Sequence, residues 1–245
     1  MFFKKHKGSF WDKYQGYNPV HSCLGLDSHI DWVKTYTNID VQTIMEIGAN
    51  FCQDSDYLSM IFGVKPENVW CFEAHPEIFA AAKKIHPNFN IFNNAVFNVE
   101  KDMVFNMYPI DCVNTGVSSL LKLVQKSLDV SGVGKFTTRP YNVKSIRMDN
   151  FMDAHNIKSI DFLKLDAEGV NYEVLQGFGS RIQDIKVIHT ESEICDNLAY
   201  ENQQENFTKI KALLESNGFE MVFYQKYYSQ ADTLWVRKDT LKKFY

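Results

Sequence analysis

The chain has 245 residues, of which 45% are hydrophobic, 14% aromatic and 23% charged. A chain of this length and composition can bury a hydrophobic core without disulfides or a structural metal, which excludes intrinsic disorder. The formal net charge of −4 argues against nucleic acid as a partner, because a phosphate backbone requires a basic surface.

Residues 1–40 mix aromatic and polar side chains, and we predict an irregular, partly helical brace that precedes a main domain at residues 41–245. A short helix is expected at 27–37, because Asp27 or Ser28 can cap it and its apolar residues share one face. The aromatic residues of this brace are expected to be mostly core, although they could stack on sugar rings. They are Trp11, Tyr14, Tyr17 and Trp32.

From residue 41 onwards, short apolar runs alternate with helical stretches. Buried strands are predicted at residues 43–47, 68–72, 90–96, 160–165 and 185–190. Helices follow the first, second and fourth of these strands and end near residues 62, 85 and 175. Runs of strand, turn and helix form right-handed βαβ units, so we predict an α/β fold with a doubly wound, mostly parallel Rossmann-like sheet.

Residues 100–150 break this rhythm. The segments 103–107 and 142–148 alternate like half-exposed strands, so we predict an inserted hairpin beside the sheet. In the tail, a helix is expected at 203–216, followed by strands at 220–224 and 233–236. These two late strands are predicted to pair antiparallel at the sheet edge.

Four predicted strands carry an acidic residue at or near their carboxyl ends, namely Glu46, Glu73, Asp166 and Glu191. Ligands of open α/β sheets bind at those ends, in the crevice formed by the loops and helix N-termini. One such acid could be a helix cap or a solvated strand end. Four acids at equivalent positions favour a ligand site, and we therefore expect them to converge on one crevice.

The first strand-to-helix turn, residues 46–50 (EIGAN), permits close backbone approach at Gly48. The dinucleotide pattern G-x-G-x-x-G is not completed after Gly48, and the phosphate-binding P-loop pattern is absent. Glu73 can accept hydrogen bonds from a ribose diol, while Glu46 favours a cationic group. S-adenosylmethionine fits this combination better than NAD or ATP does, although the first turn alone could be an ordinary tight turn.

Along the fourth strand, residues 164–169 (KLDAEG) place Lys164 and Asp166 on the same side. The ammonium would keep Asp166 ionised. A strand-end salt bridge without catalytic meaning is the alternative.

These motifs resemble the FkbM family of S-adenosylmethionine-dependent methyltransferases, in order and with matching spacing from about residue 43 to 236. The motifs are residues 46–50 (EIGAN), 72–76 (FEAHP), 94–96 (NAV), 118–120 (SSL), 148–151 (MDNF) and 164–169 (KLDAEG). Two positions depart from the family pattern: Cys52 stands where glycine is common, and Ala74 where proline is frequent. We expect Cys52 to narrow the methionine pocket without abolishing binding.

The resemblance implies roles for several of these motifs. Glu46, Gly48 and Asn50 would hold the methionine end of the cofactor, Glu73 the ribose, and Asn94 with Ala95 the adenine. The family often methylates sugar hydroxyls in glycans, lipids or natural products. Acceptor recognition is therefore expected in the 100–150 insertion, including Ser118 and Ser119.

A sugar hydroxyl is a poor nucleophile, so a general base is expected. Our hypothesis is that Asp166, beside Lys164 and Glu168, is that base or orients it. His189 is a second candidate, although a strand histidine is more often packed in a core. Asp166, Glu168 and Glu191 could also hold magnesium or manganese, since carboxylate oxygens suit both ions.

Other readings stay open at this point. They are a nicotinamide-dependent oxidoreductase, which the missing glycines disfavour, and a non-catalytic module that binds S-adenosylmethionine or a glycan.

Five cysteines without a C-x-x-C pattern indicate free thiols in a reducing compartment. No apolar run is long enough for a membrane span or follows the basic N-terminus as a signal segment, so we expect a cytoplasmic protein. The acceptor and the oligomeric state cannot be read from the sequence.

Overall fold

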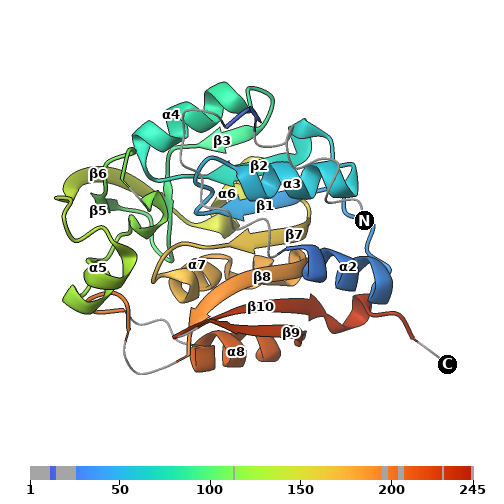
Figure 1. Cartoon of the computed structure of the whole chain (residues 1–245). Coiled ribbons are helices and arrows are strands. Elements are labelled where there is room, and N and C mark those ends of the chain that lie inside the picture. Colours follow the sequence, from blue (N-terminus) through green and yellow to red (C-terminus); the bar gives the residue numbers. More distant parts are fainter. Residues whose placement is uncertain are drawn as a thin grey trace.

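A seven-stranded sheet crosses the molecule in the order β3-β2-β1-β7-β8-β10-β9 (Figure 1). The structure is a computed structural model, and it describes residues 12–14, 26–112, 114–194, 198–203, 207–227 and 229–243. The strands are β1 (Ile44–Ile47), β2 (Val69–Phe72), β3 (Asn90–Phe92), β7 (Ile160–Leu165), β8 (Ile185–Glu193), β9 (Phe219–Tyr227) and β10 (Gln230–Arg237).

The five strands from β3 to β8 are parallel, and β10 pairs antiparallel with both β8 and β9. The central strands β1 and β7 are buried along their whole length, as expected for a sheet that helices cover on both faces. The predicted doubly wound sheet and its antiparallel edge are confirmed.

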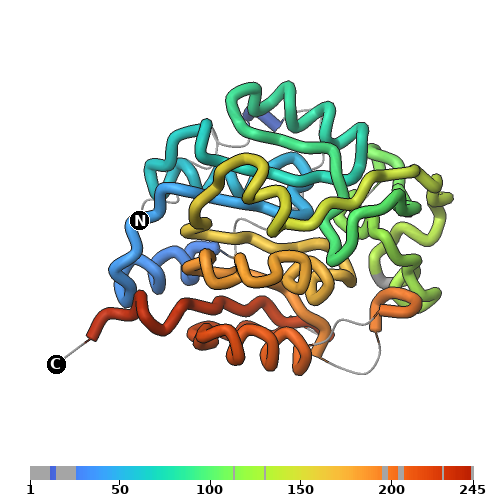
Figure 2. Tube along the Cα trace, turned by 180° about the vertical axis from the view of Figure 1, so that it is seen from behind, coloured from blue at the N-terminus to red at the C-terminus, as the bar shows by residue number. Residues whose placement is uncertain are grey.

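Helices cover both faces of this sheet, as the views in Figures 1 and 2 show. On one face lie α2 (Asp27–Tyr36), α3 (Gln53–Phe62) and α4 (Pro76–Ile85). On the other lie α6 (Met148–Ala154), α7 (Asn171–Gly177) and α8 (Phe207–Ser216). Each helix directs apolar residues at helical spacing towards the sheet, which gives the molecule two hydrophobic cores.

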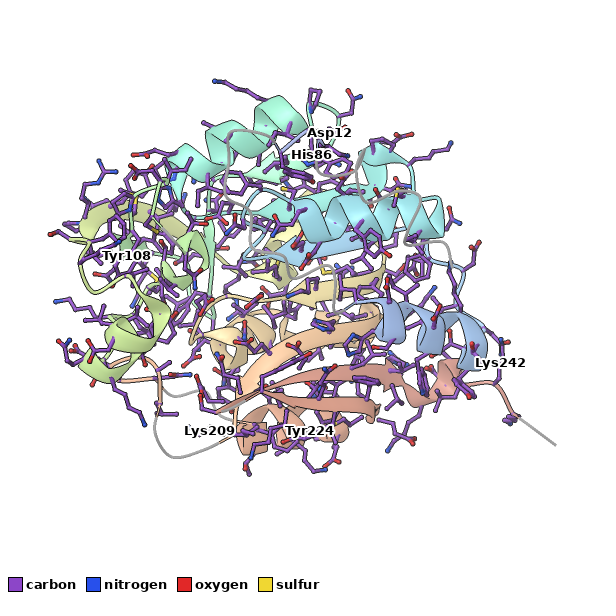
Figure 3. The ribbon with its side chains drawn as sticks, in the orientation of Figure 1. Asp12, His86, Tyr108, Lys209, Tyr224 and Lys242 are labelled. Atoms are coloured by element: carbon purple, nitrogen blue, oxygen red, sulfur yellow. The ribbon has the colours of Figure 1, made fainter. Side chains whose placement is uncertain are left out.

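A flap, defined as residues 102–146, projects beside the carboxyl ends of the parallel strands (Figure 1). Its strands β5 (Asp102–Met107) and β6 (Arg139–Ile146) pair antiparallel, and β4 (Ala95–Val96) joins β6 in a three-stranded sheet. The flap also holds α5 (Gln125–Ser131) and a small core around Tyr108, which Figure 3 labels. The predicted insertion with a hairpin is therefore present.

Three sequence predictions about elements were wrong in detail. The expected strand at 90–96 is broken, because Asn93 turns its side-chain amide to the carbonyls of Glu73 and Ala74, and β4 leaves for the flap sheet. The expected strand at 142–148 ends at Ile146, and Met148 begins α6. Helix α2 is preceded by Leu26 and has no side-chain cap, since Asp27 instead accepts a hydrogen bond from Tyr57.

Only part of the predicted N-terminal brace is described, and its division from residues 41–245 stays a prediction. Tyr14 is buried and Trp32 packs against the same core, whereas Trp11 and Tyr17 lie outside the described residues. Cys52 and Cys71 are free thiols, and both of them and Cys112 are buried, while Cys23 and Cys195 lie outside the described residues. Within the described ranges, none of the helices combines the length and apolar character that a membrane crossing requires.

Candidate active site

A cavity of about 900 Å³ opens at the carboxyl ends of β1, β2, β7 and β8, beneath the flap. All of the residues to which the sequence analysis assigned a catalytic, cofactor, acceptor or metal role line this cavity. They are Glu46, Gly48, Asn50, Glu73, Asn94, Ala95, Ser118, Ser119, Lys164, Asp166, Glu168, His189 and Glu191. The strand-end acids therefore converge on one crevice, as expected, while the roles assigned to the individual residues stay predictions.

The turn after β1 is held against both neighbouring strands. The backbone N–H groups of Gly48 and Ala49 both donate to the carbonyl of Phe72, each at 3.0 Å. Gly48 has a φ of +78°, and a Cβ atom at this position would lie 2.0 Å from the carbonyl oxygen of Asp166. Glycine is therefore required here for its backbone conformation and for the close approach of the β7 end.

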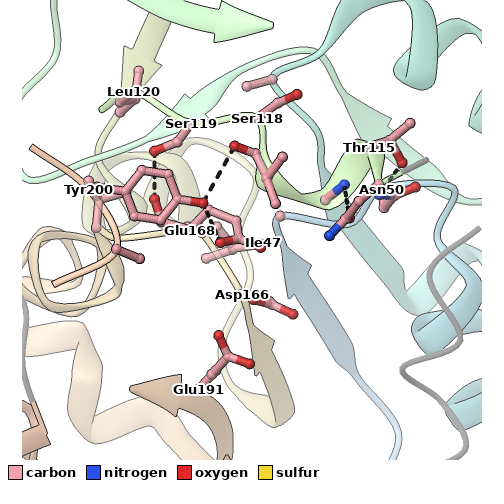
Figure 4. Close-up of a pocket in the computed structure, with 18 of the residues that line it drawn as sticks. Ile47, Asn50, Thr115, Ser118, Ser119, Leu120, Asp166, Glu168, Glu191 and Tyr200 are labelled. Atoms are coloured by element: carbon pink, nitrogen blue, oxygen red, sulfur yellow. Dashed lines mark hydrogen bonds between the residues drawn. The ribbon is translucent and has the colours of Figure 1, made fainter. Parts of the chain in front are cut away.

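Glu73 follows β2 and connects this turn to the next helix. Its Oε2 accepts from the backbone N–H of Asn50 and its Oε1 from that of His75, each at 2.7 Å. Burial raises the pKa of Glu73 to about 7, although these backbone donors oppose the rise. Asn50 also donates from Nδ2 to the Thr115 hydroxyl of the flap at 3.2 Å, a bond drawn in Figure 4.

Lys164 lies at the floor of the cavity, where only 3% of its surface is exposed. Its Nζ is 2.9 Å from Asp166 Oδ2 and 3.8 Å from Asp54 Oδ2. Burial alone would lower the pKa of Lys164, but the carboxylates of Asp166, Asp54 and Asp232 together raise it above its usual range. Lys164 is thus a buried ammonium held by carboxylates, and the predicted contact with Asp166 is present.

Glu46, on β1, is buried and lines the same cavity. Its Oε2 accepts from the backbone N–H of Ser55 at 3.0 Å, in the first turn of α3. Burial raises the pKa of Glu46 well above its usual value, and the nearby Asp54 carboxylate raises it further. A phosphate group at this helix terminus would meet these two acids, so the site suits a cationic group better than an anion.

Glu168 accepts hydrogen bonds from two neighbouring hydroxyl groups, which Figure 4 shows. Its Oε2 accepts from the Tyr200 hydroxyl at 2.6 Å, and its backbone carbonyl accepts from the Ser119 hydroxyl at 2.6 Å. Residues 198–203 in turn pair with the flap, because Val124 N–H donates to Ala199 and Glu201 N–H to Lys122. Glu168 therefore ties the β7 end to both segments that cover the cavity.

His189 lies on β8 opposite Lys164 and is 3% exposed. Burial, the Lys164 ammonium and His29 lower the pKa of His189 well below its usual value, so its imidazole is neutral. Among the described residues, none forms a hydrogen bond with its Nδ1. His189 thus faces the cavity as a packed neutral histidine, which is compatible with either interpretation offered from the sequence.

Cys52 does not narrow the cavity, contrary to expectation. Its side chain is completely buried in the core between α3 and the sheet, and it is absent from the cavity lining. Its φ of +59° lies in the left-handed region, which explains why glycine suits this position. Ala74, the other departure from the family pattern, does line the cavity.

Several cavity residues were missed from the sequence, namely Asp54, Thr115, Glu193, Tyr200 and Asp232. An acid within an apolar late strand signals Asp232, and alternation from Glu191 signals Glu193. Nothing in the local sequence signals Tyr200, because its position depends on the pairing of residues 198–203 with the flap.

The metal hypothesis gains no support from the arrangement of ligands. Across the described part of the chain, there is no group of three or more histidine, cysteine or acidic side chains arranged to hold a metal ion. Asp166 accepts from Lys164, Glu168 from Tyr200 and Glu191 from Gln230. Magnesium or manganese ligation by these three acids stays a prediction.

The strand order, the antiparallel β10 and the strand-end cavity define a Rossmann-like methyltransferase fold. The family model described as the methyltransferase FkbM domain matches residues 46–221. The chain belongs to the FkbM methyltransferase family. A comparison with curated proteins finds no match.

Among solved structures, the chain is similar to an FkbM methyltransferase from Methylobacillus flagellatus, with 12% identity, a TM-score of 0.49, and coverage of 80% of this chain and 44% of that one. The chain thus spans less than half the length of that protein. It is also similar to M. capricolum TrmK, solved with S-adenosylhomocysteine (10% identity, TM-score 0.43, coverage 89% and 71%). A third is a SAM-dependent methyltransferase from Aquifex aeolicus (11% identity, TM-score 0.41, coverage 89% and 94%).

Proposed function

We propose that this protein is an S-adenosylmethionine-dependent O-methyltransferase that acts on a hydroxyl of a sugar, a glycan or a related small molecule. The observation that carries the proposal is the convergence of Glu46, Glu73 and Asp166 on one cavity at the strand ends. Membership of a methyltransferase family supports the reaction class.

The donor chemistry of the cavity supports the cofactor. S-adenosylmethionine carries a cationic sulfonium, an amino-acid ammonium and a ribose diol, and no phosphate. The half of the cavity at β1 and β2 offers buried carboxylates on Glu46 and Glu73. We propose that Glu46, Gly48 and Asn50 hold the methionine end, that Glu73 accepts from the ribose, and that Asn94 and Ala95 border the adenine.

When bound, S-adenosylmethionine supplies a methyl group whose S–C bond breaks towards sulfur as the acceptor oxygen forms the new C–O bond. We propose that Asp166 takes the hydroxyl proton, because it lines the cavity and is oriented by a hydrogen bond from Lys164. We propose that Ser118 and Ser119, which line the cavity from the flap, contact the acceptor.

Titration calorimetry with S-adenosylmethionine, followed by a transfer assay with a labelled methyl group, tests this function. Binding with turnover supports an enzyme, binding without turnover supports a recognition module, and absence of binding removes the proposal. Glu73→Gln is expected to weaken binding by about tenfold, the cost of one lost charge-assisted hydrogen bond. Glu67→Gln, at an exposed position beside β2, is the matched control.

The base is tested separately. Asp166→Asn is expected to lower turnover by about 10² to 10⁴-fold while S-adenosylmethionine affinity is retained. Near-normal turnover in this variant would remove Asp166 from the mechanism. Turnover that is lost on chelation and restored by magnesium or manganese would support metal ligation by Asp166, Glu168 and Glu191, and unchanged turnover would remove that hypothesis.

A further inference from the structure

Three carboxylates line the cavity on the side of Asp166 that is remote from the proposed cofactor half. Glu191 and Glu193 lie on β8 and Asp232 lies on β10, whereas Glu46 lies on β1 and Glu73 directly follows β2. The sheet order places β7, with Asp166 after it, between these two groups. We call Glu191, Glu193 and Asp232 the acidic wall. The proposed methyl transfer assigns no task to Glu193 or Asp232.

The strand register brings the wall residues together. Asp232 is the direct partner of Glu191 across the antiparallel pair, so both side chains project from the same face of the sheet. Glu193 is two residues further along β8 and therefore shares that face. Like charges directly opposite each other destabilise a sheet, so folding gains nothing from this arrangement.

The wall has more negative charge than its surroundings neutralise. Lys164 is a buried cation that contacts Asp166 and Asp54 and also attracts Asp232, so one ammonium is shared among three carboxylates. Lys126 also lines the cavity, but it is exposed on the flap. Gln230 donates to Glu191, which contributes a hydrogen bond but no charge.

Glu193 has a specific unmet requirement. Only 3% of its surface is exposed, and its Oε2 accepts no hydrogen bond from any described residue. A buried carboxylate oxygen without a donor is costly, and a ligand that brings a donor removes this cost. Burial raises the pKa of Glu193 to about 7, although Ser229 and Gln230 donate to its side chain, and it raises the pKa of Asp232 to about 6, although the Lys164 ammonium opposes that rise.

We propose that the acidic wall binds a protonated amine of the acceptor, so that the substrate is an amine-bearing hydroxyl compound such as an amino sugar or an amino alcohol. This inference rests on the proposed O-methyl transfer. The amine forms charge-assisted hydrogen bonds with Glu193 and Asp232, and the hydroxyl to be methylated lies towards Asp166. The ammonium of S-adenosylmethionine does not fill this place, because its proposed binding residues belong to the β1 side of the sheet.

Matched probes test the proposal: glucosamine against glucose, and 2-aminocyclohexanol against cyclohexane-1,2-diol. Their affinities are measured by ligand-observed NMR at neutral pH, in phosphate buffer that contains no competing amine, with and without S-adenosylhomocysteine. We expect each amine to bind at least about tenfold more tightly than its neutral partner, as charge-assisted hydrogen bonds require. Glu193→Gln and Asp232→Asn should each reduce this preference and leave S-adenosylhomocysteine affinity unchanged.

Glu220→Gln, at an exposed position on β9, is the matched control and should retain the preference. Thermal unfolding verifies that each variant is folded, and two wall variants are used so that the loss of one does not decide the result. Equal affinity within both pairs, no binding of any probe, or a preference that survives both wall substitutions would overturn the acidic wall as an amine site. Failure of S-adenosylhomocysteine to bind would instead count against the proposed function, since the probes are also measured without it.

Discussion

Gly48 and Gly63 provide a matched pair for testing how the turn after β1 builds the cavity. Both have a left-handed backbone, with φ of +78° and +73°. They differ in their surroundings, because a Cβ on Gly48 would lie 2.0 Å from the Asp166 carbonyl oxygen, whereas a Cβ on Gly63 would meet nothing within 4 Å. Alanine at both positions therefore separates backbone strain from steric overlap.

The expected costs follow from these contacts. Gly63→Ala carries only the left-handed strain of about 1–2 kcal/mol, reduced by the lower entropy of the unfolded alanine chain. Gly48→Ala carries the same strain and an overlap with backbone that cannot rotate away. Ordinary contact begins at 3.4 Å, so the β1 turn and the β7 end must separate by more than an ångström. We expect an additional loss of about 1–3 kcal/mol, the usual cost of overpacking.

Urea unfolding of both variants measures these losses, and calorimetry with S-adenosylmethionine measures the effect on the cavity. Gly48→Ala should be the less stable variant and should bind the cofactor more weakly, because Asp166 is displaced. Gly63→Ala should bind as the unmodified protein does. Equal stability of the two variants would refute the argument that close approach, rather than backbone conformation alone, requires glycine at position 48.

Three further outcomes are expected. Lys164→Met should lower the free energy of unfolding at pH 8 by about 3–5 kcal/mol, because it leaves buried carboxylates without a cation. Lys65→Met, at an exposed position, is the control and should leave the free energy of unfolding almost unchanged. Equal losses in the two variants would contradict the ion-pair assignment. Burial raises the pKa of Glu193 from 4.5 to about 7. The unfolded chain therefore releases this proton at lower pH than the folded protein does, and the free energy of unfolding falls as the pH rises from 4.5 to about 7. Glu193→Gln should therefore gain stability relative to the unmodified protein between those pH values, and a pH-independent difference in chemical unfolding would argue against this. Tyr200→Phe should cost about 1.5–3 kcal/mol through loss of the hydrogen bond to Glu168, and unaltered urea unfolding would show that this bond contributes little.

The sheet was predictable because its signals are local. Apolar runs such as β7 are buried on both faces and read as strands without any tertiary information. The acids at the strand ends could be assigned to one crevice, since parallel strands place their carboxyl ends at the same edge. For this reason the predicted site residues all line one cavity.

What the sequence did not disclose depends on contacts between distant segments. The break after Phe92 arises from the hydrogen bonds of Asn93 with Glu73 and Ala74, about twenty positions earlier, and propensity alone continues the strand. Tyr200 reaches the cavity through pairing with the flap. Asp232 faces Glu191 only because β10 inserts beside β8 in one particular register. Register and loop pairing are tertiary properties, so periodicity cannot reveal them.

The position of β10 has a consequence for the order in which the molecule is assembled. This strand follows β9 along the chain, yet it lies between β8 and β9. Until β10 docks, the outer edge of β8 offers unpaired backbone groups to any other extended chain. The cavity then also lacks Asp232, which is carried by β10. Completion of the cavity lining and protection of the β8 edge against edge-to-edge aggregation therefore depend on the same strand.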